Sequence, residues 1–161
     1  MKQVYLASPL GFSPENRFYL ERVKNCLTRQ NVRIFDPWDQ PQFAGKIAHA
    51  LTIDGFAARK AAFRDIAAEI GRCNEEGIRD SDCLLAVLDG AEVDSGTASE
   101  IGFASALGKT CYGLRTDVRD CGDFTGIPLN LQVLHFIERS GGELFRSIEA
   151  IAIGLREDRR S

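Results

Sequence analysis

The sequence is poor in the residues that build metal sites and disulfide frameworks. It holds two histidines, His49 and His135, which stand far apart, and five cysteines, no two of which form a CxxC pair. An odd number of cysteines without such spacing argues against a zinc centre and against a set of disulfides. We therefore expect no bound metal, and thiols that are buried or incidental, as in a reducing cytoplasm.

Long apolar runs and an excess of one charge are also missing. No stretch approaches the roughly 20 apolar residues of a membrane-spanning helix, and the start, MKQVYLASPLGFSPENR, reads as a first strand rather than a signal peptide. The net charge of −3 indicates no basic face for nucleic acid. We expect a cytoplasmic protein with neither a membrane nor a nucleic-acid partner.

The sequence does have the composition of one globular domain. Its 161 residues, of which 44% are apolar, suit a single domain over residues 1–161 with one sizeable core. No internal repeat and no linker divides the chain.

Strand-like and helix-like patterns alternate along the chain. Short apolar runs predict strands, while helical spacing, caps and stop signals predict helices. The predicted strands are 3–7, 32–37, 82–90, 110–115 and 133–138, and the predicted helices are 13–30, 55–81, 96–108 and 142–157. Residues 41–53 read as an irregular, mobile flap, and the tail 158–161 as frayed. The alternation indicates an α/β fold with a largely parallel sheet and helices on both faces.

Polar and aromatic residues gather in the loops that follow the predicted strands. These loops are SPLGF, DPWDQ, DGAEVDSG and RTDVRD. In an open parallel sheet, ligands bind outside the carboxyl ends of the strands, so the four loops are the candidate binding region. The lone Trp38 beside two acids suits a flat ligand.

Each loop also has a purely structural interpretation. DPWD can be a turn that packs Trp38 on the core, and RTDVRD can be a solvated charge run or an Arg–Asp pair. DSGTASE can be a capped helix start whose free N–H groups attract an anion such as phosphate. It has neither the glycines of GxGxxG nor the GK[ST] of a Walker loop.

Glu100 favours a catalytic interpretation of the DSGTASE segment. With Ser95 as the expected cap, Glu100 lies in the second helical turn, followed by an apolar stripe that normally faces a core: Phe103, Ala104 and Leu107. A buried Glu is costly unless it is paired or used, and a helix N-terminus favours its ionised form. Such a carboxylate can attack a sugar carbon and form a glycosyl ester, with Asp94 as the second acid.

Four segments together resemble the nucleoside 2-deoxyribosyltransferase family: YLASPLGF, DPWD, DCLLAVLDGAEVDSGTASEIGFASALGK and GLRTDVRD. The resemblance covers about residues 3–137, and DSGTASEIG is its most specific part. It implies a flavodoxin-like fold, assembly as a homo-oligomer, and transfer of 2-deoxyribose between nucleobases without metal or cofactor. The implied ligands are nucleosides and free nucleobases.

The resemblance also implies roles on the sugar side of a site. Glu100 falls on the family's nucleophile, and Asp94 on the acid that helps to hold the sugar. Tyr5 matches an aromatic residue near the nucleophile. Gly96, which permits a tight turn at the helix start, belongs to the same substrate-binding set.

On the base side, the resemblance places Asp39 and Gln40 in a loop that contacts the nucleobase. Asn130 resembles an Asn that a neighbouring subunit extends towards the sugar 5′-hydroxyl, which implies at least a dimer with shared sites. Asn74 departs from the family pattern, because some members carry an Asp there that is proposed to act at the base. An Asn can hydrogen-bond a base but cannot give it a proton at neutral pH.

Three functions follow from these residues. The first is a retaining double displacement in which Glu100 attacks C1′ and a second base attacks the resulting ester. With water as acceptor, the protein would be a nucleoside 5′-monophosphate N-glycosidase, whose phosphate Ser95, Thr97 and Ser99 could hold. Asp94 favours the transferase, because it would repel a phosphate and accept a bond from a 5′-hydroxyl. A non-catalytic nucleotide-binding module would leave an acid on the core side of a helix unexplained.

Overall fold

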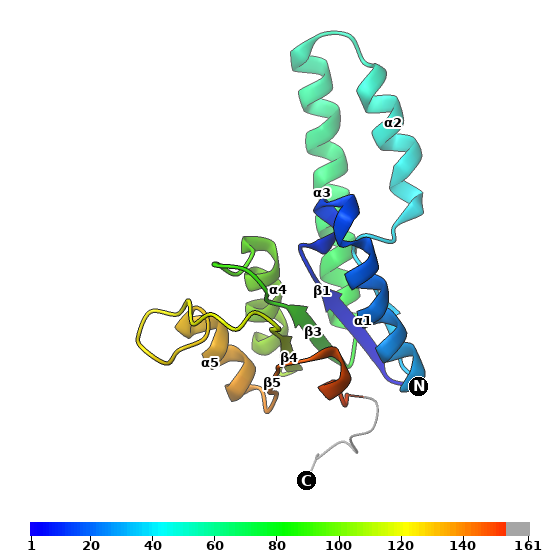
Figure 1. Cartoon of the computed structure of the whole chain (residues 1–161). Helices are drawn as coiled ribbons and strands as arrows, with labels where there is room; N and C mark the ends of the chain where they lie inside the picture. The colour runs from blue at the N-terminus through cyan, green and yellow to red at the C-terminus, as the bar shows by residue number, and fades with distance from the viewer. Residues whose placement is uncertain (154–161) are drawn as a thin grey trace.

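The computed structural model describes residues 1–153 of the chain, and its centre is a single sheet (Figure 1). Within these residues, five strands pair in the order β2-β1-β3-β4-β5, and each of these pairs is parallel. The strands are β1 Gln3–Ala7, β2 Arg33–Phe35, β3 Cys83–Val87, β4 Thr110–Leu114 and β5 Leu144–Phe145. This order is that of flavodoxin-like folds, which confirms the predicted α/β class and parallel sheet.

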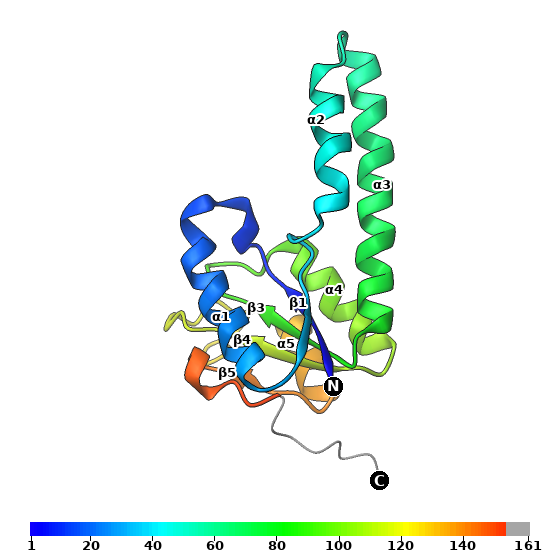
Figure 2. The same cartoon turned by 90° about the vertical axis from the view of Figure 1, so that its right-hand side faces the viewer.

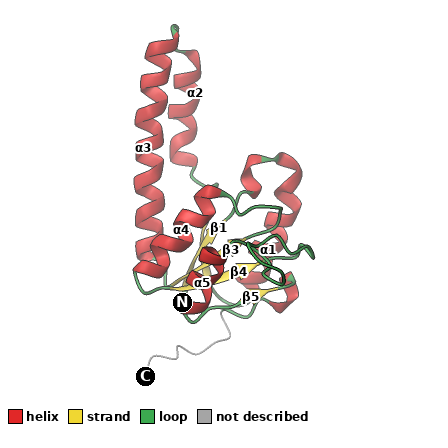
Figure 3. Cartoon of the chain, turned by 90° about the vertical axis from the view of Figure 1, so that its left-hand side faces the viewer, coloured by secondary structure: helices red, strands yellow, loops and turns green. Residues whose placement is uncertain are grey.

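Helices cover both faces of this sheet (Figures 2 and 3). They are α1 Arg17–Arg29, α2 Ala44–Thr52, α3 Phe56–Asp80, α4 Ser95–Ala106 and α5 Leu131–Arg139. Alternate strand residues point to opposite faces, so Val4 and Leu6 pack with α1, while Tyr5 and Ala7 pack with α4 and α5. All of β3 is buried, as its continuous apolar run predicts.

Helices α2 and α3 form a hairpin that extends beyond the sheet (Figures 1 and 2). Residues 41–53, predicted to be an irregular flap, are instead a 3-10 turn, Pro41–Phe43, followed by α2. The prediction was wrong because α2 offers no broad core-facing stripe. Its helix is supported by contact with α3, and apart from Ala50 its residues stay outside the core.

The C-terminal region contains the other wrong assignments. Residues 133–138, predicted as the last strand, lie in α5, because Val133 and Ile137 are one helical turn apart and are buried together. The helix predicted over 142–157 is instead β5 and a 3-10 turn, Ile148–Ala150. Gly142 begins this stretch so close to β4 that a Cβ there would overlap the Cys111 carbonyl. Residues 154–157 of that prediction, and the tail 158–161, lie outside the described residues.

The remaining elements are confirmed with shifted ends. The helix predicted over 13–30 begins as a 3-10 turn, Pro14–Asn16, before α1, and Ser13 makes no side-chain capping bond. The helix predicted over 55–81 is α3, and the one over 96–108 is α4. Phe18 and Phe56, two of the apolar residues in the predicted helices, are exposed. Within residues 1–153, none of the helices is long and apolar enough to span a membrane.

Candidate active site

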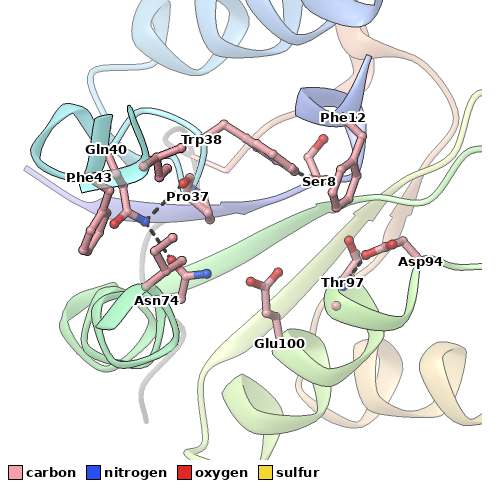
Figure 4. A pocket seen from close by; sticks show the side chains of 13 residues that line it. Ser8, Phe12, Pro37, Trp38, Gln40, Phe43, Asn74, Asp94, Thr97 and Glu100 are labelled. Atoms are coloured by element: carbon pink, nitrogen blue, oxygen red, sulfur yellow. Dashed lines mark hydrogen bonds between the residues drawn. The ribbon is translucent and has the colours of Figure 1, made fainter. Parts of the chain in front are cut away.

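A cavity of about 370 Å³ opens at the carboxyl ends of β1, β2 and β3, where the parallel-sheet rule places a ligand (Figure 4). Its volume lies in the range of small-molecule sites. Loops after the three strands, together with α2, α3 and α4, supply its walls. The residues that line it are Ser8, Phe12, Pro37, Trp38, Gln40, Phe43, Ile47, Ile70, Asn74, Asp94, Gly96, Thr97 and Glu100.

Glu100 lies in the middle of the cavity wall and is fixed from below by Tyr5. The Tyr5 hydroxyl donates a hydrogen bond of 2.6 Å to Oε1 of Glu100. Tyr5 is fully buried on β1, and its ring stacks on Phe35 of β2 at 5.3 Å between ring centroids. The strand therefore holds one carboxylate oxygen of Glu100, while no hydrogen bond within residues 1–153 holds the other, Oε2.

The surroundings of Glu100 shift its acidity. Burial raises the pKa of Glu100 to about 6, the Tyr5 hydrogen bond lowers it, and the nearby charge of Asp94 raises it. Burial and the charge of Glu100 hold the pKa of Tyr5 far above its ordinary value, so Tyr5 stays a donor. Glu100 is thus largely ionised at pH 7, as expected for a nucleophile, although its pKa is raised rather than lowered.

Asp94 is the N-cap of α4, and Ser95, the expected cap, is the first residue of the helix. Oδ2 of Asp94 accepts a hydrogen bond of 2.9 Å from the backbone N–H of Thr97. Gly96 suits this arrangement, because a Cβ there would lie 3.1 Å from that oxygen. Both Asp94 and Gly96 line the cavity, so the cap places a second carboxylate beside Glu100.

An aromatic wall faces the carboxylates across the cavity. Trp38 donates from Nε1 to the backbone carbonyl of Ser8 at 2.7 Å, and Phe12 meets its ring edge-on at 4.5 Å between centroids. A Cβ at Gly11 would overlap the indole, so glycine is required for this contact. Trp38 is 41% exposed rather than buried in the core. It therefore lines the cavity, and contact with a flat ligand stays a prediction.

Sequence reasoning missed the ion pair that holds the Trp38 loop. Asp36, at the end of β2, is buried and lies 3.0 Å from Nζ of Lys24 on α1. Its Oδ1 accepts a 2.9 Å hydrogen bond from the backbone N–H of Trp38. An Asp two residues before a backbone N–H is a turn signal, so the DPW run indicated the hydrogen bond to Trp38 but not the ion pair with Lys24.

Side-chain amides form the end of the cavity farthest from Asp94 (Figure 4). Nε2 of Gln40 donates to the Pro37 carbonyl at 3.1 Å and to Oδ1 of Asn74 at 2.7 Å. Gln42 in turn donates to Oε1 of Gln40 at 3.3 Å. Two predicted substrate-binding residues, Gln40 and Asn74, are therefore brought together although they lie on different elements.

Two predicted substrate-binding residues do not line this cavity. Asp39 is exposed, and its backbone N–H bonds the Asp36 carbonyl within a turn. Asn130 caps α5, where its side chain accepts from the N–H groups of Gln132 and Val133. It lines a separate cavity of about 430 Å³, next to Arg115 and Asp123.

The remaining predicted loops have structural roles. Asp117 and Arg119 of RTDVRD form an ion pair, and Arg115 is buried with its guanidinium on backbone carbonyls. Of the three hydroxyls considered for phosphate, Thr97 lines the cavity, whereas Ser95 and Ser99 are exposed outside it.

Several lining residues were not predicted. They come from the loop after β1 and from the α2–α3 hairpin: Ser8, Phe12, Phe43, Ile47 and Ile70. The SPLGF loop carried a signal for the first two. Phe43 and Ile47 lie in residues 41–53, which the sequence predicts to be irregular, and Ile70 lies in the predicted helix over 55–81, where no pattern marks it as a cavity residue.

A protein-family model described as nucleoside 2-deoxyribosyltransferase matches residues 4–132, a span that contains Tyr5 and every residue of the cavity wall. The chain belongs to this family. Nucleoside 2-deoxyribosyltransferases are enzymes, so the cavity around Glu100 is the candidate active site of a nucleoside-processing enzyme. A comparison with curated proteins finds no significant match.

Solved structures agree with the nucleoside 2-deoxyribosyltransferase assignment. A 2-desoxiribosyltransferase from Leishmania mexicana is 28% identical over 93% of both chains, with a TM-score of 0.64. A conserved protein from Enterococcus faecalis V583 is 26% identical over 92% of this chain and 93% of its own, also with a TM-score of 0.64. A CMP N-glycosidase from Clostridium botulinum, 15% identical over 92% and 93% with a TM-score of 0.51, shares the fold.

Proposed function

We propose that the protein transfers 2-deoxyribose between nucleobases through a covalent glycosyl ester on Glu100. The observation that carries the proposal is the Tyr5–Glu100 pair at the cavity floor. A buried tyrosine holds one oxygen of an ionised, half-buried carboxylate, so that the second oxygen is directed to a ligand. A carboxylate in this state is what attack on an anomeric carbon requires.

The two ends of the cavity suit the two halves of a nucleoside. The aromatic wall of Trp38 and Phe12 and the amides of Gln40 and Asn74 suit a flat base with polar edges (Figure 4). The opposite end, at Asp94, suits a sugar hydroxyl that donates a hydrogen bond. Glu100 lies between these ends, where C1′ would be.

The reaction then proceeds in two balanced steps. Oε2 of Glu100 forms a bond to C1′ as the C1′–N bond breaks, and the electron pair goes to the departing base, which takes up a proton from water. A second base, losing a proton to water, attacks C1′ and returns the pair to Glu100. Two inversions give overall retention and ping-pong kinetics. The missing 2′-hydroxyl makes the oxocarbenium-like state easier to reach, and no step uses a metal or cofactor.

A nucleoside 5′-monophosphate N-glycosidase is the second candidate. It is favoured by the start of α4 at the cavity, where Gly96 and Thr97 offer a place for an anion. Asp94 opposes it, because its carboxylate occupies the cap of that same helix and would repel a phosphate.

One incubation distinguishes these functions. The protein is mixed with deoxyinosine, with and without free adenine, and the products are separated by chromatography. New deoxyadenosine supports the transferase, and hypoxanthine released without an acceptor indicates a hydrolase. No reaction with deoxyinosine, thymidine or their monophosphates would reject both and leave a binding module.

We also propose that the active unit is a homo-oligomer, at least a dimer, with shared sites. Asn130 lies outside the cavity of its own chain. By family resemblance it reaches the sugar end of a neighbour's site, where a neutral amide can both donate to and accept from a hydroxyl.

A further inference from the structure

The amide groups at the base end of the cavity have a fixed hydrogen-bond direction. The anchor is the backbone carbonyl of Pro37, which can only accept. Gln40 must therefore turn its NH₂ group towards Pro37, and the same nitrogen lies 2.7 Å from the side chain of Asn74. Donation from Gln42 to Oε1 of Gln40 agrees with this direction.

This direction determines which atom Asn74 offers to a ligand. Since Gln40 approaches as a donor, Asn74 must receive it with Oδ1. Its NH₂ group then points to the other side, and Figure 4 shows the nitrogen facing Glu100 and the cavity. Within residues 1–153 this nitrogen has no hydrogen-bond partner. This end of the cavity thus presents the NH₂ group of Asn74 as a donor. The Pro37 carbonyl fixes its orientation through Gln40.

We propose that Asn74, oriented by Gln40, selects nucleobases by the polarity of one edge and favours oxo bases over amino bases. The inference rests on the proposed function, because it concerns the base that this site releases or accepts. Guanine and hypoxanthine present neighbouring acceptors at N7 and O6, whereas adenine presents an acceptor and an NH₂ donor. Among pyrimidines, thymine presents the O4 acceptor where cytosine presents the N4 donor.

The selectivity follows from the cost of an unmatched polar group. An NH₂ group of the base placed against the NH₂ group of Asn74 leaves both donors without partners in a partly dry site. Asn74 cannot rotate to relieve this mismatch without placing its own NH₂ against that of Gln40. We expect a preference of about tenfold or more in kcat/KM for the oxo member of each pair.

The wild-type test compares matched pairs of substrates: deoxyinosine with deoxyadenosine, and deoxyuridine with deoxycytidine. A preference for the oxo member in both pairs supports the inference, and equal rates or a preference for the amino members overturn it. If no nucleoside reacts at all, the proposed function fails instead. Fluorescence of Trp38, the single tryptophan, then still measures whether hypoxanthine binds more tightly than adenine.

Two variants test the direction of the hydrogen bonds that link Pro37, Gln40 and Asn74. Asn74→Asp in its ionised form presents only acceptors, and Gln40→Glu forces Asn74 to turn its NH₂ away from the cavity. Both should shift the ratio of oxo to amino kcat/KM towards amino bases by about tenfold. The matched control is Glu76→Gln, an exchange of the same size at an exposed position of α3, which should keep the wild-type ratio. An unchanged ratio in Gln40→Glu, with the variant folded by circular dichroism, overturns the role of Gln40.

Discussion

Glu100 and Tyr5 form a hydrogen-bonded pair in which each residue shifts the pKa of the other. Burial favours the neutral carboxyl, and the 2.6 Å hydrogen bond from Tyr5 favours the carboxylate. The result is a carboxylate that is charged at neutral pH but poorly solvated. Such a group gains more from bonding to a positive carbon than a carboxylate in water does.

The first prediction concerns Glu100, the proposed nucleophile. Glu100→Gln keeps the size of the side chain and its ability to accept from Tyr5, but it removes the negative oxygen. We expect turnover to fall by several orders of magnitude, as for other removed nucleophiles, with circular dichroism unchanged.

A labelling experiment serves as the control for this prediction. Wild-type protein treated with a 2-fluoro-substituted deoxynucleoside should gain the mass of the sugar on the peptide that carries Glu100. Near-normal turnover in Glu100→Gln, or a label elsewhere, contradicts the covalent mechanism.

The second prediction concerns stability and pH at the same residue. The pKa of Glu100 rises from an ordinary 4.5 to about 6 on folding, so the folded state binds the proton more tightly than the unfolded state does. Stability contributed by Glu100 is therefore lost as pH rises from 4.5 to 6, by up to about 2 kcal/mol. Glu100→Gln stays neutral and should be more stable than the wild type above pH 6.

Urea denaturation at two pH values measures this difference. The free energy of unfolding of Glu100→Gln should exceed that of the wild type at pH 7.5, and the two should converge below pH 4.5. A difference that is the same at both pH values would mean that the carboxyl is not desolvated.

The central residues of the site could be predicted from the sequence because short, local patterns carry them. Asp94, Gly96 and Glu100 all lie at the start of α4. The preceding strand, β3, sets the position of this helix start at the edge of the sheet. Asp39 was predicted to contact the base but is exposed, while Asp36 of the same loop is buried against Lys24. Which of the two acids is buried depends on Lys24 of α1, and no pattern within the loop reveals that contact.

At the scale of an element, the start of α4 combines a structural and a chemical role in one side chain. Oδ2 of Asp94 caps the helix, while the same carboxylate lies at the end of the cavity that we propose holds the sugar. The two roles can be separated, because Asn is as good an N-cap as Asp but carries no charge.

The third prediction uses this separation. Asp94→Asn should keep wild-type stability, and Asp94→Ala should lose about 1 kcal/mol with the cap. Both should narrow the preference for deoxyinosine over its 5′-monophosphate, since a repulsion of about 1 kcal/mol or more is removed. The measurement is kcat/KM for the two substrates with each variant. A wild-type preference for the monophosphate would favour the N-glycosidase instead.

Other elements show where sequence patterns are insufficient. The apolar run at 133–138 fits a short strand as well as one buried helix face, and only packing of Val133 and Ile137 against the sheet decides for α5. Helix α2 depends on α3, which follows it in the sequence. In both cases the deciding contact comes from a part of the chain that a local window does not contain.

At the scale of the whole molecule, the position of Asn130 determines the fourth prediction. Glu100→Gln and Asn130→Ala are prepared separately, each nearly inactive, and are then dissociated and reassembled together. If sites are shared, some receive Glu100 from one chain and Asn130 from its neighbour, so part of the activity returns. A mixture that stays inactive, with subunit exchange verified by mass spectrometry, would refute shared sites.

The strand order has a consequence for synthesis on the ribosome. β1 is flanked by strands on both sides, yet its partner towards the middle of the sheet, β3, lies 79 residues further along the chain. Until β3 has left the ribosome, the nascent β1 can pair only with β2, and the N–H and C=O groups of its other edge stay unpaired. The sheet is therefore completed in the second half of translation, and α4, the helix that carries Glu100, begins shortly after β3. A chain that stops before β3 lacks three of the five strands and the helix that carries Glu100, so it has neither the complete sheet nor the proposed nucleophile.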